Sequence, residues 1–251
     1  MKSKTKIVGL SFLFTILLAN HALAFDFSGW DALLKKHVKS TSIDGVKLNG
    51  VDYVEIKKDP GYIKLIAGLK VFSPKALKTR REKLAFWINT YNVMAVKMVL
   101  DHYPVESIKD AGGIFSSVWK KKVGQVGGKD VTLNEIEHEI LRPMGEPRIH
   151  VAIVCASVSC PDLRPEAYKE DQLDGQLNDQ MRQFLANSSK GLKVSGKDVY
   201  ISKIFKWFEE DFEVKGGVSN FLYPYAPNST RVALKNVSFD YLDYNWNLNK
   251  L

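Results

Sequence analysis

The sequence predicts an α+β fold, in a single domain over residues 25–251, with a buried central helix packed on a small mixed or antiparallel sheet. Helical and strand patterns mix without the regular strand–helix–strand rhythm of a parallel sheet. Glycine pairs separate short strand-like segments, which is typical of hairpins. One long helical segment is apolar almost all round, as buried helices are. No internal repeat and no long Pro/Gly/Ser linker divides the chain.

Three helices are predicted in the N-terminal half. Residues 27–38 place Trp30, Leu33, Leu34 and Val38 at helical spacing, and a short helix covers residues 60–69. The longest helix spans residues 81–100, where the apolar side chains leave only a narrow polar side with Thr90 and Lys97. This helix is therefore expected at the centre of the fold.

Strands and helices alternate in the rest of the chain. Residues 118–131 form a hairpin around Gly127-Gly128, and a Thr132–Glu135 capping box starts a helix that ends near Pro143. The continuous apolar run 149–154 predicts a central buried strand. We then expect an amphipathic helix over 172–186, a hairpin between Gly191 and Gly196, a helix over 204–212 capped by Ser202, and a returning strand over 237–248.

Residues 1–24 have the pattern of a signal peptide. Lys2, Lys4 and Lys6 precede the apolar segment 7–18, which is too short to remain in a bilayer, and Ala22-Leu23-Ala24 gives a cleavage site after Ala24. We therefore expect a periplasmic or secreted protein without stable membrane insertion. Removing 24 of 251 residues and three lysines leaves 227 residues and lowers the net charge from +8 to +5.

A chain of this length can bury enough surface to fold without disulfides. Its composition also argues against a nucleic-acid partner. The longest basic run, residues 120–122, is predicted to lie on a solvent-exposed strand of a hairpin. The sequence shows no nucleic-acid-binding motif. We expect no nucleic-acid partner and no cofactor. The substrate and the oligomeric state stay unknown.

One set of motifs covers nearly all of the expected mature chain. The set comprises residues 84–92 (LAFWINTYN), 104–108 (PVESI), 136–138 (IEH) with 141–142 (LR), 147–150 (PRIH), 155–161 (CASVSCP), 204–207 (IFKW) with 211–212 (DF), and 244–249 (YNWNLN). In order and content the set resembles the domain of unknown function 547 (DUF547) family. The resemblance implies no defined activity. A papain-like or transglutaminase-like fold is an analogy at the level of fold alone.

Cys155 and Cys160 are the two cysteines of the chain, and they follow the predicted strand. Three readings stay open: a structural Cys155–Cys160 disulfide, a catalytic Cys155 thiol, or a labile redox pair. A disulfide across so short a loop stabilises by only about 2 kcal/mol. A catalytic thiol needs a neighbouring base or cation that lowers its pKa.

His138, His150 and Glu137 are the candidate partners of that thiol. A strand from His150 to Cys155 would span about 16 Å and place the two side chains on opposite faces. His138 is therefore the first candidate for the base and His150 the second. Glu137 points into the apolar arc of its helix, where a carboxylate must be paired or protonated. It is expected to orient a histidine, His150 first, or to form a structural ion pair with Arg148 or Arg81.

Asn89 and Asn92 lie one helical turn apart within the predicted central helix. Buried amides must find hydrogen-bond partners, so the two side chains either brace a loop or bind a substrate carbonyl oxygen. The spacing of His138, His150 and Glu137 matches no compact zinc pattern, and we predict no metal site.

Two functions follow from these patterns. The favoured one is a thiol-dependent hydrolase or acyltransferase that acts on amide or peptide bonds through Cys155, with a histidine base. The alternative is a non-catalytic periplasmic binding or accessory domain in which Cys155 and Cys160 form a structural disulfide.

Overall fold

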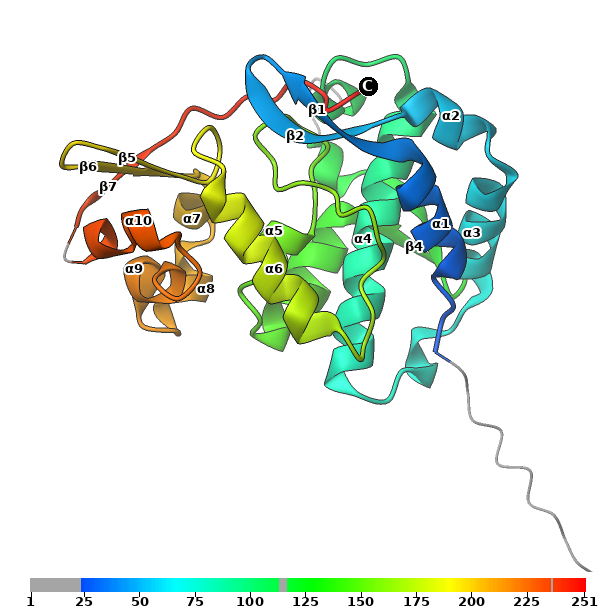
Figure 1. Cartoon of the computed structure of the whole chain (residues 1–251). Coiled ribbons are helices and arrows are strands. Elements are labelled where there is room, and N and C mark those ends of the chain that lie inside the picture. Colours follow the sequence, from blue (N-terminus) through cyan, green and yellow to red (C-terminus); the bar gives the residue numbers. More distant parts are fainter. Residues whose placement is uncertain (1–23, 113–116, 236) are drawn as a thin grey trace, which may run out of the picture.

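The computed structural model describes residues 24–112, 117–235 and 237–251. The predicted signal peptide lies outside the described residues apart from Ala24. In these ranges, helices and three small sheets mix without a parallel strand–helix repeat, so the predicted α+β class is confirmed (Figure 1). The papain-like or transglutaminase-like fold stays a prediction. Among the described residues, no helix has both the length and the apolar character needed to cross a membrane.

The predicted central helix is α4 (Arg80–His102), which the other elements surround (Figure 1). It begins at a capping box, because Thr79 accepts a hydrogen bond from the Glu82 N–H and the Glu82 carboxylate accepts one from the Thr79 N–H. Every residue from 84 to 100 except Lys97 is buried. Thr90, expected on the polar side, is fully buried as well.

The N-terminal elements cover one side of α4. They are α1 (Ser28–His37), β1 (Val38–Ile43), β2 (Val46–Val51), α2 (Tyr53–Lys58), α3 (Pro60–Val71) and η1 (Pro74–Ala76). Helices α1 and α3 confirm two predictions. The β1–β2 hairpin was not predicted, although Asp44-Gly45 is a hairpin signal. Both residues adopt positive φ angles, 51° and 76°, which suit a tight antiparallel turn.

The predicted glycine hairpin is present as β3 (Lys122–Val126) and β4 (Lys129–Thr132), after η2 (Ile108–Ala111) and η3 (Val118–Lys120). Strand β3 packs closely on α4 because Gly124 lacks a side chain. A Cβ there would lie 2.7 Å from the Met94 sulfur. The Thr132–Glu135 capping box also forms. Its helix is a π-helix, η4 (Glu135–Leu141), followed by η5 (Arg142–Met144). Short π-helices often occur at functional sites.

The predicted strand over residues 149–154 is wrong. Residues 149–152 form a single helical turn, α5 (Ile149–Ala152), and the chain becomes extended only at Ile153. Periodicity cannot distinguish a short buried helix from a buried strand. Here a side-chain amide decides, because Asn92 accepts from the Val154 N–H and donates to the Ala152 carbonyl, which replaces strand pairing.

The last third contains α6 (Leu173–Ala186), β5 (Leu192–Ser195), β6 (Asp198–Ile201), α7 (Ile204–Trp207), α8 (Glu209–Glu213), α9 (Gly217–Leu222), α10 (Asn228–Arg231), η6 (Val232–Leu234) and β7 (Phe239–Tyr241). The predicted helix over 204–212 is broken at Phe208. The predicted C-terminal strand shrinks to β7, which pairs parallel to β6. The remaining C-terminal residues run back across the molecule to β2 (Figure 1), where the Val51 N–H donates to the Asn249 carbonyl.

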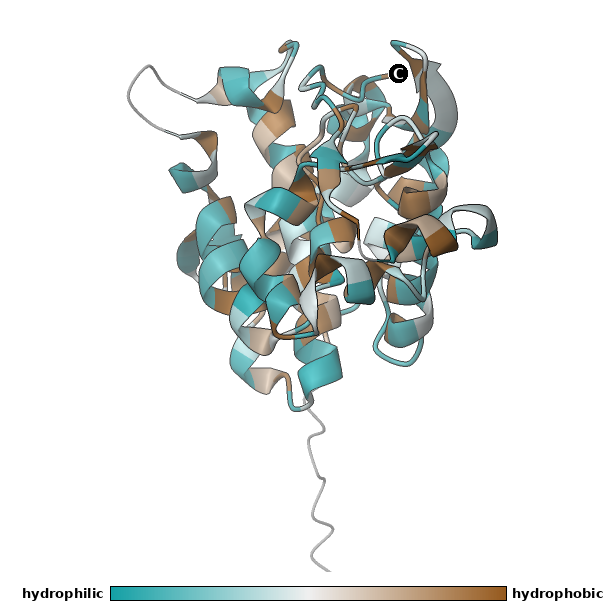
Figure 2. Cartoon of the chain, turned by 90° about the vertical axis from the view of Figure 1, so that its left-hand side faces the viewer, coloured by the Kyte–Doolittle hydropathy of each residue, from teal (hydrophilic) through white to brown (hydrophobic). Residues whose placement is uncertain are grey.

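Within the described ranges, buried apolar side chains form two clusters. The larger cluster surrounds α4, and the smaller one joins α6 to β5, β6 and the helices α7–α9. The inner parts of the helices are hydrophobic and many outer turns are hydrophilic (Figure 2). Helix α5 contributes to both clusters, Ile149 and Ala152 to the larger and Val151 to the smaller. The segment just before Cys155 therefore lies where the two cores meet.

Candidate functional site

Cys155 lies at the start of a sharp turn between the two cores. The next residue, Ala156, has a φ of +58°, a conformation that costs energy for a residue with a Cβ. The C-terminal segment holds the turn, because the N–H groups of Val158 and Ser159 donate to the carbonyls of Asn247 and Asn245. This strained turn presents the Cys155 sulfur to a cleft.

Four polar atoms converge on this turn. The Cys155 Sγ lies 3.2 Å from the Ser157 hydroxyl, 3.2 Å from the Tyr244 hydroxyl and 2.9 Å from the Cys160 Sγ. The Cys155 N–H also donates to the Cys160 sulfur at 2.8 Å. Both cysteines are free thiols in this structure, so the Cys155–Cys160 disulfide, one of the three interpretations that the sequence left open, is not formed in it.

The two thiols differ in acidity. Burial opposes ionisation of Cys155, but hydrogen bonds from Cys160, Ser157 and Tyr244 outweigh it and lower the pKa to about 7. Burial and the neighbouring Cys155 raise the pKa of Cys160 well above its ordinary value. Burial likewise raises the pKa of Tyr244, which keeps its hydroxyl protonated. Cys155 is thus the better nucleophile of the pair.

His150 lies on α5 and faces the same cleft. Its ring stacks on Phe208, with centroids 4.0 Å apart, and its Nε2 lies 2.7 Å from an oxygen of Asp211. Burial lowers the pKa of His150, so the ring is neutral near pH 7. Its Nε2 donates to Asp211, which leaves Nδ1 as the proton acceptor. That Nδ1 is buried and has no hydrogen-bond partner among the described residues.

Asp211 completes this pair, and sequence reasoning gave it no role. Burial raises its pKa, but hydrogen bonds from His150 and Arg142 reverse the effect and hold that pKa well below its usual range. The Arg142 guanidinium binds both Asp211 oxygens, at 2.7 and 2.9 Å. Asp211 lies between aromatic residues of the predicted helix 204–212. A carboxylate next to the buried aromatic face of a helix is the sequence feature that could have indicated a functional role for Asp211.

Arg142 also determines the state of His138. Its guanidinium lies 3.0 Å from the His138 Nδ1, and arginine has only donors. The Nδ1 is therefore unprotonated and the Nε2 carries the hydrogen. Burial and the nearby Arg142 charge lower the pKa of His138. His138, the first candidate for the base, thus lines the cleft as a donor, and His150 has the free acceptor.

Glu137 is buried, as the helical arc predicted, and it lines the cleft. Its Oε2 accepts a hydrogen bond from the Tyr91 hydroxyl at 3.1 Å, and its Oε1 lies 4.0 Å from the His150 Nδ1. The expected ion pair of Glu137 with Arg148 or Arg81 is not formed, because Arg148 binds Glu146 and Arg81 pairs with Asp174. Burial raises the pKa of Glu137 to about 7 despite the Tyr91 hydrogen bond.

Asn89 and Asn92 brace backbone outside the cleft. Asn89 donates to the Tyr168 carbonyl and accepts from the Tyr168 N–H, at 2.8 and 2.9 Å. Asn92 binds the two backbone groups that precede Cys155 in the same way. Neither amide lines the cleft, so the role of binding a substrate carbonyl does not fit the structure. Asn92 instead positions Cys155.

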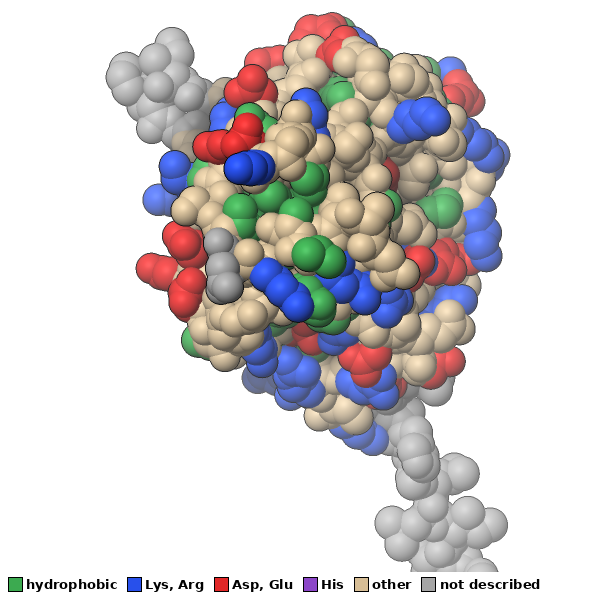
Figure 3. Space-filling model, turned by 60° about the vertical axis from the view of Figure 1, so that its left-hand side comes forward, with side chains coloured by type: hydrophobic (Ala, Val, Ile, Leu, Met, Phe, Trp, Pro, Cys, Tyr) green, Lys and Arg blue, Asp and Glu red, His purple; other side chains and the backbone are tan. Residues whose placement is uncertain are grey.

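The Cys155 cleft has a volume of about 240 Å³ and walls rich in aromatic side chains. Its aromatic side chains are Tyr91, Trp119, Trp207, Phe208, Tyr244 and Trp246. The Trp246 ring also carries the Lys109 ammonium 3.4 Å from its centroid, and Trp207 is 46% exposed at the surface. On the face shown in Figure 3, hydrophobic side chains gather between basic and acidic ones. Such walls suit an apolar or planar ligand group.

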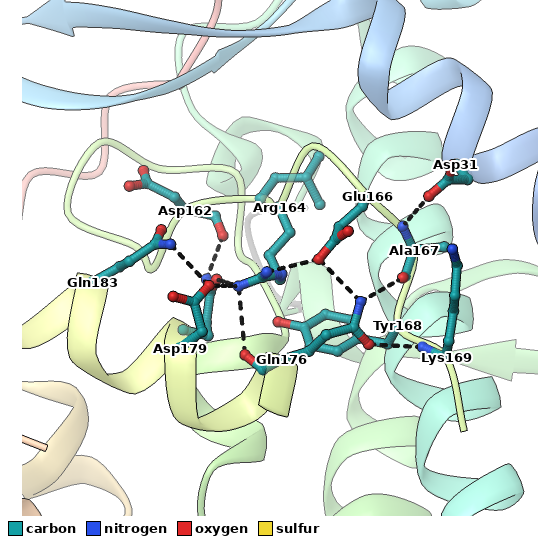
Figure 4. A network of polar contacts seen from close by, with 12 residues as sticks. Asp31, Asp162, Arg164, Glu166, Ala167, Tyr168, Lys169, Gln176, Asp179 and Gln183 are labelled. Carbon is teal, nitrogen blue, oxygen red and sulfur yellow. Dashed lines mark hydrogen bonds and ion pairs between the residues drawn. The ribbon is translucent and has the colours of Figure 1, made fainter. Parts of the chain in front are cut away.

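A polar network anchors the loop that follows Cys160 (Figure 4). Arg164 binds the carboxylates of Glu166 and Asp179, at 2.7 and 2.6 Å. Gln180 donates to the Asp162 carbonyl at 2.6 Å. The Lys190 ammonium is fully buried and donates to the Cys160 carbonyl at 2.9 Å and to the Asp162 carboxylate at 2.6 Å. The buried Lys190 ammonium therefore fixes the backbone at Cys160.

The arrangement combines an acidic thiol with a buried His150–Asp211 pair in one cleft. No hydrogen bond joins the Cys155 sulfur to an imidazole within the described ranges. No group of three or more His, Cys, Asp or Glu side chains in these ranges is placed to hold a metal ion.

Residues 74–185 match the family model described as "Protein of unknown function, DUF547". The matched segment runs from η1 through α6 and contains Cys155, Cys160, Glu137, His138 and His150, whereas Asp211 follows it. No curated protein and no solved structure matches the chain. This match supports the resemblance of the chain to the DUF547 family.

Proposed function

We propose that this protein is a thiol-dependent hydrolase or acyltransferase that acts on amide or peptide bonds. The observation that carries the proposal is the placement of two complementary groups in one cleft. Cys155 supplies a thiol with a lowered pKa, and His150 supplies a buried imidazole nitrogen that has no hydrogen-bond partner in the described part of the chain. An activated nucleophile with a base that a third group orients is the arrangement that covalent acyl transfer uses.

The reaction follows from the protonation states. The Cys155 proton passes to the Nδ1 of His150, and the sulfur attacks the substrate carbonyl carbon. Asp211 accepts from the Nε2 of His150 and stabilises the imidazolium. Collapse of the intermediate breaks the carbon–nitrogen bond, and the leaving amine takes the proton from His150. Water or a second amine then releases the acyl group from Cys155 and restores the thiol.

Two donors are available to the oxygen of the tetrahedral intermediate. The Tyr244 hydroxyl is held protonated by its raised pKa and lies 3.2 Å from the attacking sulfur. The Nε2–H of His138 is the second donor, since its Nδ1 faces Arg142. Preorganised donors of this kind strongly stabilise the developing charge.

The cleft also suggests what the substrate carries. An apolar cavity of about 150 Å³ holds a benzene molecule, and the Cys155 cleft measures about 240 Å³. It therefore has room for one ring-sized group together with the reacting bond. Because the walls are aromatic, we propose an apolar or aromatic group beside the scissile carbonyl.

The experiment is to trap the acyl-enzyme. The reduced protein is mixed with the p-nitrophenyl esters of acetate and of phenylacetate, and adducts are mapped by mass spectrometry. We expect an adduct on Cys155, formed faster with the phenylacetyl ester, and none in Cys155→Ala. Asp211→Asn should slow turnover about a hundredfold or more with little change in KM. Absence of any adduct on Cys155 would overturn the proposal and favour the non-catalytic binding role.

The compartment of the protein is part of the proposal. Residues 1–24 have the order of a signal peptide, so export would leave a chain that begins at Phe25. N-terminal sequencing of the protein from a periplasmic fraction tests this. A product that retains Met1 and stays in the cytosolic fraction would contradict export.

A further inference from the structure

The distance between the two sulfurs is the starting observation. The Sγ atoms of Cys155 and Cys160 lie 2.9 Å apart, whereas a disulfide bond measures about 2.05 Å. Closing the bond therefore requires a movement of less than about 1 Å. Acyl transfer needs one thiol, so the mechanism above leaves the second thiol without a chemical role.

The environments of the two thiols differ in the way that stepwise disulfide exchange requires. Cys155 is only partly shielded and faces the cleft, where it can meet an external sulfur atom. Cys160 is buried, 3% exposed, and has Cys155 as its sulfur neighbour. Cys160 also lines the cleft, but it exposes less surface than Cys155, so an external disulfide meets Cys155 first.

The backbone of Cys160 is held in place by a buried cation. The Lys190 ammonium donates to the Cys160 carbonyl and to Asp162, and Asp162 also accepts from the Asn49 N–H at 3.0 Å. A buried lysine is costly unless it is paired in this way. Lys190 is thus a positioning residue, which keeps the Cys160 sulfur beside Cys155.

We propose that Cys155 and Cys160 form a redox-active dithiol that reduces disulfide-bonded substrates, a second activity of this cleft. The Cys155 thiolate attacks one sulfur of the substrate, a Cys155 mixed disulfide forms, and the other half leaves as a thiol after taking up a proton. Cys160 then attacks the Cys155 sulfur, and its proton goes to the departing sulfur. The substrate gains two electrons and two protons, and the protein is left with a Cys155–Cys160 disulfide. An external dithiol reduces that bond again.

The test uses 4,4′-dithiodipyridine, a neutral aromatic disulfide that suits the aromatic walls and releases a coloured thiopyridone. The reduced wild-type protein should release two equivalents, carry no pyridyl adduct, and lose the mass of two hydrogen atoms. Cys160→Ala should stop after one equivalent, with a stable adduct on Cys155. Cys155→Ala should react far more slowly, because Cys160 is buried.

Three results would overturn the proposal: a stable single adduct in the wild type, adducts on both cysteines, or no release at all. Lys190→Met should slow the second release and leave the first unchanged, whereas Lys193→Met, at an exposed lysine on β5, is the matched control. If Lys190→Met does not fold, as judged by circular dichroism, Cys160→Ala still decides. No acyl donor is present in this assay, so its outcome is independent of acyl transfer.

Discussion

Replacing Glu137 by glutamine should change how stability depends on pH. The carboxyl is buried and its side chain is 8% exposed, and burial raises its pKa from 4.5 to about 7. In the unfolded chain the group ionises near its ordinary pKa. Between these two pH values the folded state holds a proton that the unfolded state has lost, so the free energy of unfolding falls as the pH rises.

The size of this effect follows from the same two values. Each pH unit of difference corresponds to about 1.4 kcal/mol, so the rise to about 7 amounts to roughly 3 kcal/mol. Glutamine is neutral throughout and can still accept the hydrogen bond from Tyr91. Near pH 4 the variant and the wild type should be similarly stable, and at pH 8 the variant should be more stable by about 3 kcal/mol.

Urea unfolding under reducing conditions, at several pH values from about 4 to 8 and constant ionic strength, measures this difference. Subtracting the two curves removes the contributions of groups that titrate in both proteins. Glu139→Gln, which removes a carboxyl from an exposed position of the same helix, is the matched control. If the Glu137→Gln difference is flat, the carboxyl is not protonated in the folded state and the reasoning fails.

Three further predictions concern the surrounding structure. Asn92→Ala should lower the free energy of unfolding by about 2–5 kcal/mol in urea titrations, because it leaves the buried Val154 N–H and the buried Ala152 carbonyl without the Asn92 amide. A loss below about 0.5 kcal/mol would contradict the bracing role of Asn92. Gly191→Ala should abolish soluble expression, since its Cβ would lie 1.8 Å from a backbone oxygen. In the control variant Gly175→Ala, in α6, the new Cβ meets nothing within 4 Å, so this variant should raise the midpoint of thermal unfolding. Equal behaviour of the two variants would refute the close packing at Gly191. In the wild type, the rate of Cys155 alkylation by iodoacetamide should rise with pH around 7. In Cys160→Ala the same rise should occur at higher pH, because the Cys155 thiolate loses a hydrogen bond. Identical pH profiles would show that Cys160 does not lower the pKa of Cys155.

The local sequence contained most of the helices and hairpins. The apolar circumference of residues 84–100 indicated the buried α4, and the glycine pair and capping box indicated the β3–β4 hairpin and the start of η4. Glu137 was correctly expected to point inward, because helical spacing determines the face of a side chain. These features depend on residues within a few positions of one another, so one sequence is enough to predict them.

The tertiary structure decided what distant residues do to each other. The run 149–154 became a helical turn because the Asn92 amide, 60 residues away from Ala152, takes the backbone groups that strand pairing would have used. The contacts of His138 with Arg142 and of His150 with Asp211 determine which ring nitrogen of each histidine carries the proton. Hydrogen bonds across the chain set these protonation states, and no local pattern encodes them. The sequence by itself therefore named the thiols and the histidines, and only the fold assigned the acceptor nitrogen to His150.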